Sequence, residues 1–173
     1  MLGLRRGAVQ LASHDPRWIR YGSETAQRIA MHLGLPTVRV QHVGSTAVRS
    51  LRAKPILDIV VGIESASAVD DAVVRIAELG FVDHGTGPGS VGRFLVMEPY
   101  PGFRTIHLHI VRYESDDWRA YIDFRDALCA DAELRARYVA VKHDLARRHR
   151  HDRRTYRDRK AEFVEAELKR LLR

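Results

Sequence analysis

A short polar segment, Gly44 to Thr46, lies between two apolar runs. Asp58 lies inside the second run, 14 residues after Gly44. Glycine lets the backbone come close to a ligand, while hydroxyls and N–H groups at a helix start can bind phosphate. A carboxylate within an apolar strand needs a reason, and one reason is to hold a divalent cation that bridges phosphate oxygens. The spacing favours phosphate and metal chemistry at one edge of a sheet, although Gly-Ser-Thr taken alone is more often a simple capped turn.

His107 and His109 are the second group of candidate ligands, in a run where polar and apolar residues alternate. Side chains two residues apart lie on the same face of a strand, so both imidazoles can converge on one ligand or one metal ion. A single strand histidine is usually only a packing or surface residue, whereas a pair favours a site. We predict that Asp58 lies within ligand distance of His107 or His109.

The stretch from Val38 to Ile63 must position most of these groups. It reads as a strand, a turn, a short helical or looped segment, and a second strand that carries Asp58. Strands that consist mostly of Val and Ile are covered on both faces of a sheet. We predict that a helix begins near Ser45 and that the chain then returns as a neighbouring strand.

Further elements are predicted on both sides of this stretch. They are an opening strand at Val9–Ser13, a helix from Asp15 to about His32, a helix from Val69 to about Ala77, a strand at Phe81–Val82, a hairpin with arms Arg93–Met97 and Thr105–Val111, and helices over 115–130, 131–149 and 152–172. The glycine-rich segment from His84 to Gly92 is predicted to be a mobile loop, either a lid over phosphates or a plain hairpin connection.

Length and composition restrict the class of protein. The 173 residues, of which 45% are hydrophobic and 29% charged, suit one globular domain, with a sheet layer over residues 1–113 and a helical layer over 114–173. The single Cys129 excludes an intrachain disulfide, and there is no signal sequence or long apolar run, so we expect a cytoplasmic protein without a membrane partner.

Charge favours an anionic partner, because 29 basic residues exceed 22 acidic ones. From Arg147 to Lys160, eight basic residues accompany Asp152 and Asp158. Such a run is most often a solvated helix face with Arg–Asp pairs, and the alternative is a docking strip for RNA or a polyphosphate tail.

The stretches HVGSTAV and AKPILDIVVGI resemble the GrpB family, which belongs to the DNA-polymerase-β-like nucleotidyltransferase superfamily. The stretches HDPRW, RTIHLHIV, FRDAL, YVAVKHDLA and YRDRKAEFVEAEL extend the resemblance over nearly the whole chain. The resemblance implies an α/β (α+β) fold, with a nucleotidyltransferase-like mixed sheet flanked by helices and a helical C-terminal layer.

The resemblance also implies a metal-dependent nucleotidyltransferase, in which an acceptor oxygen attacks the α-phosphorus of a nucleoside triphosphate and pyrophosphate leaves. The implied nucleotide- and phosphate-binding residues are Gly44, Ser45, Thr46, Arg49, Lys54 and Lys142. The implied catalytic residues and ligands of a divalent metal, Mg²⁺, Mn²⁺ or Zn²⁺, are Asp58, His107 and His109.

Two departures from the superfamily pattern leave alternatives open. The signature D-x-D pairs two carboxylates on one strand face, but Val60 stands at the second position and cannot bind a cation. One Asp and two His suit Zn²⁺ or Mn²⁺ better than Mg²⁺. VRSL replaces the family's VPGL, so Arg49 adds a cation where proline is usual. The alternatives are a module that binds a nucleotide, another phosphorylated small molecule or RNA without transfer, and a metal-dependent phosphohydrolase.

Overall fold

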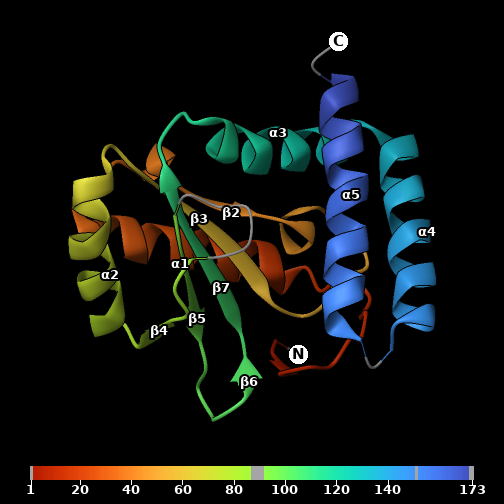
Figure 1. Ribbon diagram of the computed structural model, residues 1–173, viewed down its shortest axis with the longest axis horizontal. Coiled ribbons are helices and arrows are strands. Elements are labelled where there is room, and N and C mark those ends of the chain that lie inside the picture. The colour runs from red at the N-terminus through yellow and green to blue at the C-terminus, as the bar shows by residue number, and fades with distance from the viewer. Residues whose placement is uncertain (1, 87–91, 151, 172–173) are drawn as a thin grey trace.

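A five-stranded mixed sheet lies at the centre of the computed structural model, which describes residues 2–86, 92–150 and 152–171 (Figure 1). The strands, in their order across the sheet, are β2 (Val40–Val43), β3 (Leu57–Ile63), β7 (Ile106–Arg112), β5 (Arg93–Met97) and β4 (Phe81–Asp83). The central pair β3 and β7 is parallel, and the other neighbours are antiparallel. A separate two-stranded ribbon joins β1 (Leu4–Arg5) to β6 (Phe103–Arg104).

Helices cover the sheet and also lie beside it. Those described are α1 (Arg17–Leu33), α2 (Val69–Glu78), α3 (Asp116–Ala130), α4 (Ala132–Arg148) and α5 (Arg153–Leu171), with short 3-10 segments η1 (Thr37–Arg39), η2 (Ser45–Ala47) and η3 (Ala66–Ala68). Figure 1 shows α3 crossing one end of the sheet, with α4 and α5 side by side next to it. The predicted mixed sheet with flanking helices and a helical C-terminal layer is confirmed.

The main core follows from the alternation of residues along the strands. Leu57, Ile59 and Val61 of β3 are at most 1% exposed and pack with α1 and α2 in one apolar cluster. The intervening residues, Asp58 and Val60, must therefore point to the opposite face. This alternation removes Asp58 from the core and turns it toward the side of the C-terminal helices.

A second apolar cluster joins the segment after β2 to the C-terminal helices. Val48 and Leu51, each 1% exposed, pack with side chains of α3 and α4, among them Phe124, Leu134 and Tyr138. These contacts link residues more than 70 positions apart, so they hold the segment between β2 and β3 against the helical layer.

Several predicted elements are confirmed and others are wrong. The hairpin of β5 with β7 is present, and Asp131 begins α4 by accepting hydrogen bonds from the N–H groups of Glu133 and Leu134. The predicted strand at Val9–Ser13 is wrong, because only Ala12 makes a bridge, to Ala53.

The helix predicted to begin near Ser45 is present only as one 3-10 turn, and the predicted return of the chain as a neighbouring strand is confirmed by the pairing of β3 with β2. Ser45–Ala47 is a single 3-10 turn, and Val48 is already extended. The burial of Val48 and Leu51 in the second apolar cluster explains this difference, because that packing draws the chain away from a helical path. Residues 87–91 of the predicted lid lie outside the described residues.

Among the described residues, no helix has both the length and the apolar character needed to cross a membrane.

Candidate functional site

Asp58 lies on the same face of the sheet as both predicted histidines. The parallel register of β3 and β7 places Asp58 opposite His107 and Val60 opposite His109. Asp58 Oδ1 is 3.3 Å from His107 Nδ1 and 3.7 Å from His109 Nε2. The side chains of Asp58, His107 and His109 are 31%, 14% and 23% exposed, so the group is partly open to solvent. The structure therefore brings these three residues together as predicted.

The two imidazoles keep Asp58 in its charged form. Burial alone would raise the pKa of Asp58, but the hydrogen bond from His107 and the nearby imidazole of His109 lower it far below its ordinary range. Burial lowers the pKa of His107, and the adjacent carboxylate partly offsets this effect. Asp58 is therefore a fixed negative charge at neutral pH, and a weak base.

Gly44 makes room for the Asp58 carboxylate. Its backbone has φ +69° and ψ −169°, a region that is essentially restricted to glycine. A Cβ atom at Gly44 would lie 2.7 Å from Asp58 Oδ2, well inside van der Waals contact. Gly44 thus allows a close approach to Asp58, whereas the predicted approach to a ligand stays a prediction.

The charge of Asp58 acts on three of the four lysines in the chain, although the chain holds 25 arginines. Lys142 Nζ of α4 donates hydrogen bonds to Ser45 Oγ at 3.0 Å and to the Arg52 carbonyl at 2.5 Å. Lys54, from the segment before β3, and Lys160 of α5 complete the group, which we call the lysine cluster. The remaining lysine, Lys169, is exposed near the end of α5.

Aromatic rings of α4 and α5 support the ammonium groups of the lysine cluster. Lys142 Nζ lies 4.6 Å from the ring centre of Tyr138, and Lys54 Nζ lies 4.8 Å from that of Tyr156. Tyr138 and Tyr156 are 4% and 1% exposed, so these cation–π contacts are shielded from water. Lys160 interacts with Tyr138, Tyr156 and Asp58, which together raise its pKa in spite of burial.

The other two lysines carry a strong electrostatic penalty. Burial, followed by the charge of Lys160, lowers the pKa of Lys54 to about 7, and the same two effects lower that of Lys142 to about 7. The charge of Asp58 opposes the shift in both cases. Three crowded cations with one carboxylate between them form a site with an excess of positive charge.

Two predicted phosphate-binding residues lie apart from this group. Thr46 is 1% exposed, and its Oγ1 is hydrogen-bonded to His42 Nε2 at 3.0 Å, so its hydroxyl is committed inside the protein. Arg49 is exposed, and its charge acts on His14 of the N-terminal segment. The structure therefore brings Gly44, Ser45, Lys54 and Lys142 into one group with Asp58 and leaves Thr46 and Arg49 outside it.

Sequence reasoning missed two aromatic residues that fix His109. The rings of Phe94 and Tyr121 lie 5.2 Å and 5.0 Å from the imidazole of His109, one on β5 and the other on α3. Phe94 is the register partner of His109, so the predicted hairpin could have identified it. The scarcity of lysine was a second unused signal, because it singles out Lys54, Lys142 and Lys160 among 29 basic residues.

The predicted metal ligands do not fit a resident metal site. Both imidazoles direct a nitrogen at the same oxygen, Asp58 Oδ1, rather than at a point shared with the carboxylate. Over residues 2–86, 92–150 and 152–171, no group of three or more His, Cys, Asp or Glu is placed to hold a metal ion. Val60, at the position of the signature's second carboxylate, is 0% exposed and packs with Val43 and Trp118. Mg²⁺ prefers oxygen ligands, which this set supplies from a single carboxylate.

Only part of the basic run from Arg147 to Lys160, around Arg154 and Arg157, has the character of a solvated helix face, because Arg153 and Lys160 are partly buried. Asp158 pairs with Arg154 at 3.8 Å and with Arg157 at 2.9 Å, and both arginine side chains are more than half exposed. Exposed pairs of this kind contribute little to stability and keep the charge of the strip partly neutralised.

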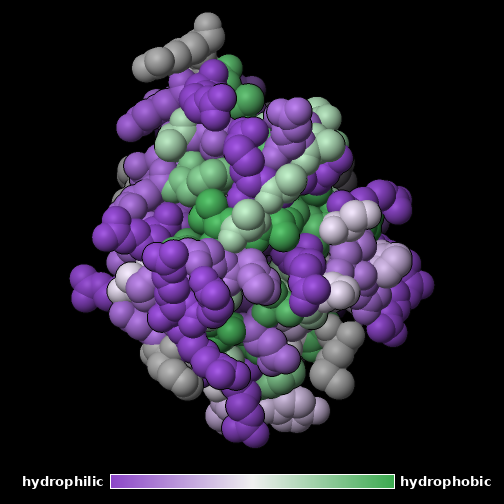
Figure 2. Space-filling view, turned by 90° about the vertical axis from the view of Figure 1, so that its right-hand side faces the viewer, coloured by the Kyte–Doolittle hydropathy of each residue, from purple (hydrophilic) through white to green (hydrophobic). Residues whose placement is uncertain are grey.

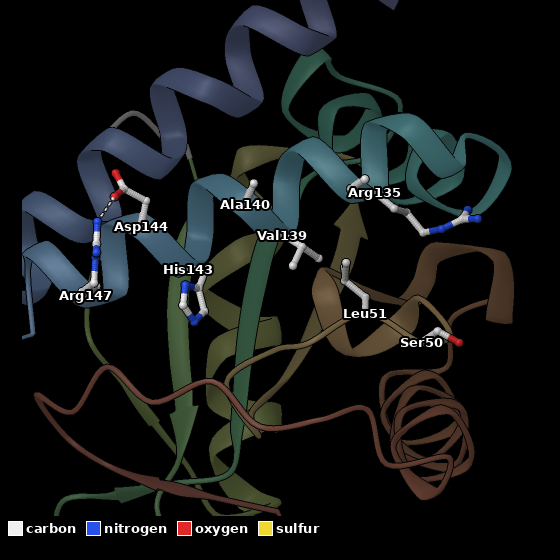
Figure 3. A pocket seen from close by; sticks show the side chains of 9 residues that line it. Ser50, Leu51, Arg135, Val139, Ala140, His143, Asp144 and Arg147 are labelled. Atoms are coloured by element: carbon white, nitrogen blue, oxygen red, sulfur yellow. Dashed lines mark hydrogen bonds and ion pairs between the residues drawn. The ribbon is translucent and has the colours of Figure 1, made fainter.

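An apolar groove of about 780 Å³ lies between α4 and the segment after η2 (Figure 3). Leu51 and Val139 point toward each other across it, and His143 extends from the next turn of α4 (Figure 3). Figure 2 shows apolar residues across the middle of an otherwise hydrophilic face, on the side of the molecule that carries α4 and α5 in Figure 1. A second hollow of about 490 Å³ lies between α1, β2 and α3. Asp58 and Lys142 line neither of them, so both are separate from the candidate site.

Comparison with known proteins gives consistent matches over most of the chain. Residues 8–170 match the family described as GrpB protein. The glutamate-rich protein GrpB of Alkalihalophilus pseudofirmus is 32% identical over 170 residues, which cover 95% of this chain and 97% of that protein. The crystal structure of the conserved protein GrpB from Enterococcus faecalis is 26% identical with a TM-score of 0.73, over 92% of this chain and 99% of that one.

A more distant match places the fold in a wider group. The Cid1 poly(U) polymerase, solved with MgATP bound, has a TM-score of 0.55 over 79% of this chain and 44% of its own. At 14% identity this likeness shows a shared nucleotidyltransferase fold and nothing about activity.

Proposed function

The chain belongs to the GrpB family and has a nucleotidyltransferase-like fold, and from this premise we propose that it binds the phosphates of a nucleotide, or of another phosphorylated small molecule, beside Asp58. The observation that carries the proposal is the lysine cluster. Its three members, Lys54, Lys142 and Lys160, come from three different segments of the chain. The charge of one carboxylate, Asp58, acts on all three.

The chemistry of the lysine cluster suits a polyphosphate. Ammonium groups are compact charges with three donors each, and they bind phosphate oxygens without requiring one fixed geometry. In the free protein Lys54 and Lys142 lose protons readily, so a bound polyanion would restore their charge and relieve the repulsion within the cluster. The Ser45 hydroxyl, already bonded to Lys142, lies at the same place and adds a neutral donor.

Binding should therefore be accompanied by proton uptake. Lys54 and Lys142 have pKa values of about 7, so in the free protein both become protonated as the pH falls from about 8.5 to 6.5. We expect nucleotide affinity to rise over the same interval, until protonation of the phosphates begins to oppose it.

Nucleotidyl transfer is the second candidate function, favoured by the carboxylate that lies between two imidazoles. In Cid1 the same fold holds MgATP. Transfer requires that the acceptor loses its proton while its oxygen bonds to the α-phosphorus and pyrophosphate leaves. We assign that proton to His109, because its side chain is more exposed than that of His107, whose Nε2 is buried.

The metal-dependent form of this reaction has weaker support than phosphate binding. Asp58 alone supplies carboxylate oxygens, and Val60 is packed where a second carboxylate would stand. Hydrolysis, with water as the acceptor, would use the same groups as transfer and is distinguished from it only by the products.

Calorimetric titration with ATP, in EDTA and then in Mg²⁺, tests the proposal on wild type, Lys142→Met and Lys169→Met. Both variants lose one positive charge, but only Lys142 belongs to the lysine cluster. We expect Lys142→Met to weaken binding about tenfold or more, since a hydrogen-bonded charge is lost. Lys169→Met should bind like the wild type, and EDTA should change the affinity by less than about threefold because lysines carry the phosphate contacts.

Two results would contradict the proposal. One is equal loss of affinity in the two variants, which would make binding a general effect of charge. The other is the absence of any ATP, ADP or pyrophosphate binding by the folded wild-type protein, with folding checked by circular dichroism.

A further inference from the structure

A continuous series of contacts leads from Asp58 to a second positive region. Asp58 is hydrogen-bonded to His107, whose ring centre lies 5.2 Å from that of Phe94. Phe94 lies 6.1 Å from the ring of His84, and His84 Nε2 is 3.5 Å from Arg104 Nη2. Arg104 belongs to β6 of the two-stranded ribbon, so these contacts connect the ribbon to the candidate site through His84, Phe94 and His107.

Arg153 faces the same region from the helical layer. It is the first residue of α5, one turn before Tyr156, and Lys54 Nζ lies 4.8 Å from the Tyr156 ring. Burial lowers the pKa of Arg153, and the charges of Arg104, Arg157 and Arg6 lower it further. The charge of Arg153 in turn acts on Lys54 and His107, so Arg153 is within electrostatic range both of the candidate site and of Arg104 and Arg6, the residue after β1.

Acidic partners account for only part of this charge. Glu98 Oε1 accepts from Arg104 Nε at 2.8 Å, and Asp158 pairs with Arg157 at 2.9 Å. In the described part of the chain, Arg153 itself has no acidic partner. A half-buried guanidinium that faces other cations and has no carboxylate is costly unless an anion joins it.

We propose that Arg153, together with Arg6 and Arg104, forms a second anion subsite that takes the phosphate group of a second phosphorylated small molecule beside the bound nucleotide. The planar fork of arginine matches phosphate oxygens with two parallel hydrogen bonds, so this subsite favours a phosphomonoester. The proposal rests on the proposed function, because it assigns the lysine cluster to the nucleotide and names the chemical class of the molecule that lies next to it.

The test is a titration of inorganic phosphate into protein saturated with an ATP analogue whose α–β bridge is a methylene group. Saturation occupies the lysine cluster and prevents turnover, so added phosphate reports on the remaining site. The proteins are wild type, Arg153→Gln and Arg154→Gln. Arg154 is the neighbouring residue, its side chain is 87% exposed, and its substitution removes the same charge.

We expect Arg153→Gln to weaken phosphate binding about tenfold or more while changing the affinity for the analogue less than about threefold. Arg154→Gln should change neither. If Arg153→Gln instead weakens binding of the triphosphate analogue and leaves phosphate binding unchanged, Arg153 holds the nucleotide's own phosphate and the second subsite is refuted. Equal effects of both variants would also refute it.

The outcomes separate this inference from the proposed function. Wild-type protein that binds the analogue but shows no further phosphate binding overturns only the second subsite. Protein that does not bind the analogue overturns the proposed function. In that case the same phosphate titration without nucleotide decides the subsite alone, through the difference between Arg153→Gln and Arg154→Gln.

Discussion

The two faces of the β3–β7 pair differ sharply, although they come from alternate residues of the same strands. On the α1 and α2 side, Leu57 and Ile59 of β3 and Leu108 of β7 are at most 1% exposed and belong to one apolar cluster. On the other side, the polar side chains of Asp58 and His107 are 31% and 14% exposed. One face stabilises the fold, and the other places charged groups at its surface.

The polar face is itself divided at Val60. Asp58 and the histidines lie next to the lysine cluster, whereas Val60, one position further along this face, is buried under Trp118 of α3. The difference between Asp58 and Val60 shows that coverage by helix α3, and not the alternation along the strand alone, decides which residues are available for chemistry. It also explains why a second carboxylate is absent there, since an unpaired charge under α3 would be strongly unfavourable.

Placing a carboxylate at the buried position gives the largest expected effect. Val60→Asp should lower the free energy of unfolding by about 4 kcal/mol or more, because it buries an unpaired charge in an apolar cluster. Val82→Asp is the matched control, since Val82 is a strand residue that is 52% exposed, and it should cost less than about 1 kcal/mol. Urea denaturation measures both. A stable Val60→Asp protein with Mg²⁺-dependent ATP binding would show that the division at Val60 is wrong.

Closing the space beside Asp58 gives the next largest effect. Gly44→Ala should lower the free energy of unfolding by about 3 kcal/mol and abolish nucleotide binding, because the backbone is strained for alanine and the new Cβ meets the carboxylate. Gly34 has a similar φ of +67° with nothing within 4 Å, so Gly34→Ala should cost only about 1 kcal/mol and leave binding intact. Thermal denaturation and calorimetry compare the two. Equal losses of stability and binding in the two variants would mean that glycine is needed at position 44 only for its backbone conformation, and not for the space beside Asp58.

The pH dependence of stability gives a smaller effect that is specific to the lysine cluster. Lys142 has a folded-state pKa of about 7, and an unfolded lysine has a pKa of about 10.4. Between these values the unfolded chain binds more protons, so the contribution of Lys142 to stability rises with pH from about 7 to 10. Below pH 7 both states are protonated, and the penalty of the buried charge is fully present.

Lys142→Met should remove this contribution. The free energy of unfolding of the variant minus that of the wild type should be higher at pH 6.5 than at pH 9.5, by about 1 kcal/mol or more. The lost hydrogen bonds to Ser45 and Arg52 lower its stability at both pH values and do not alter the comparison. Urea denaturation at the two pH values measures the difference, with Lys169→Met as the control. If the free energy of unfolding changes equally between the two pH values in all three proteins, the charge of Lys142 is exposed to water and the burial penalty is refuted.

The strand pattern made part of the site predictable. Alternation placed Asp58 opposite the core, and the spacing of His107 and His109 placed both on one face, because these relations depend only on residues close in sequence. Gly44 was predictable for the same reason, since a turn between two strands needs a residue with freedom of backbone conformation.

Long-range packing decided the rest. Thr46 is buried because its hydroxyl meets His42, whose ring in turn lies against α1 where Gly22 leaves space for it. The expected helix at Ser45 is limited to one 3-10 turn because Val48 and Leu51 join a cluster with the C-terminal helices. The contact of His42 with α1 and the packing of Val48 and Leu51 cannot be read from local patterns. The meeting of three lysines from separate segments depends on the same packing of α4 and α5 against the sheet.

The ammonium signals of the lysines provide the most direct test, because the chain has only four lysines. Their Nζ resonances can be followed by NMR at about pH 6 and assigned with Lys→Arg variants while the non-hydrolysable ATP analogue is added. We predict that the signals of Lys54, Lys142 and Lys160 shift together along one saturation curve and that the signal of Lys169 does not move. Saturable binding that leaves the three cluster signals unchanged would contradict the assignment of this site to phosphate.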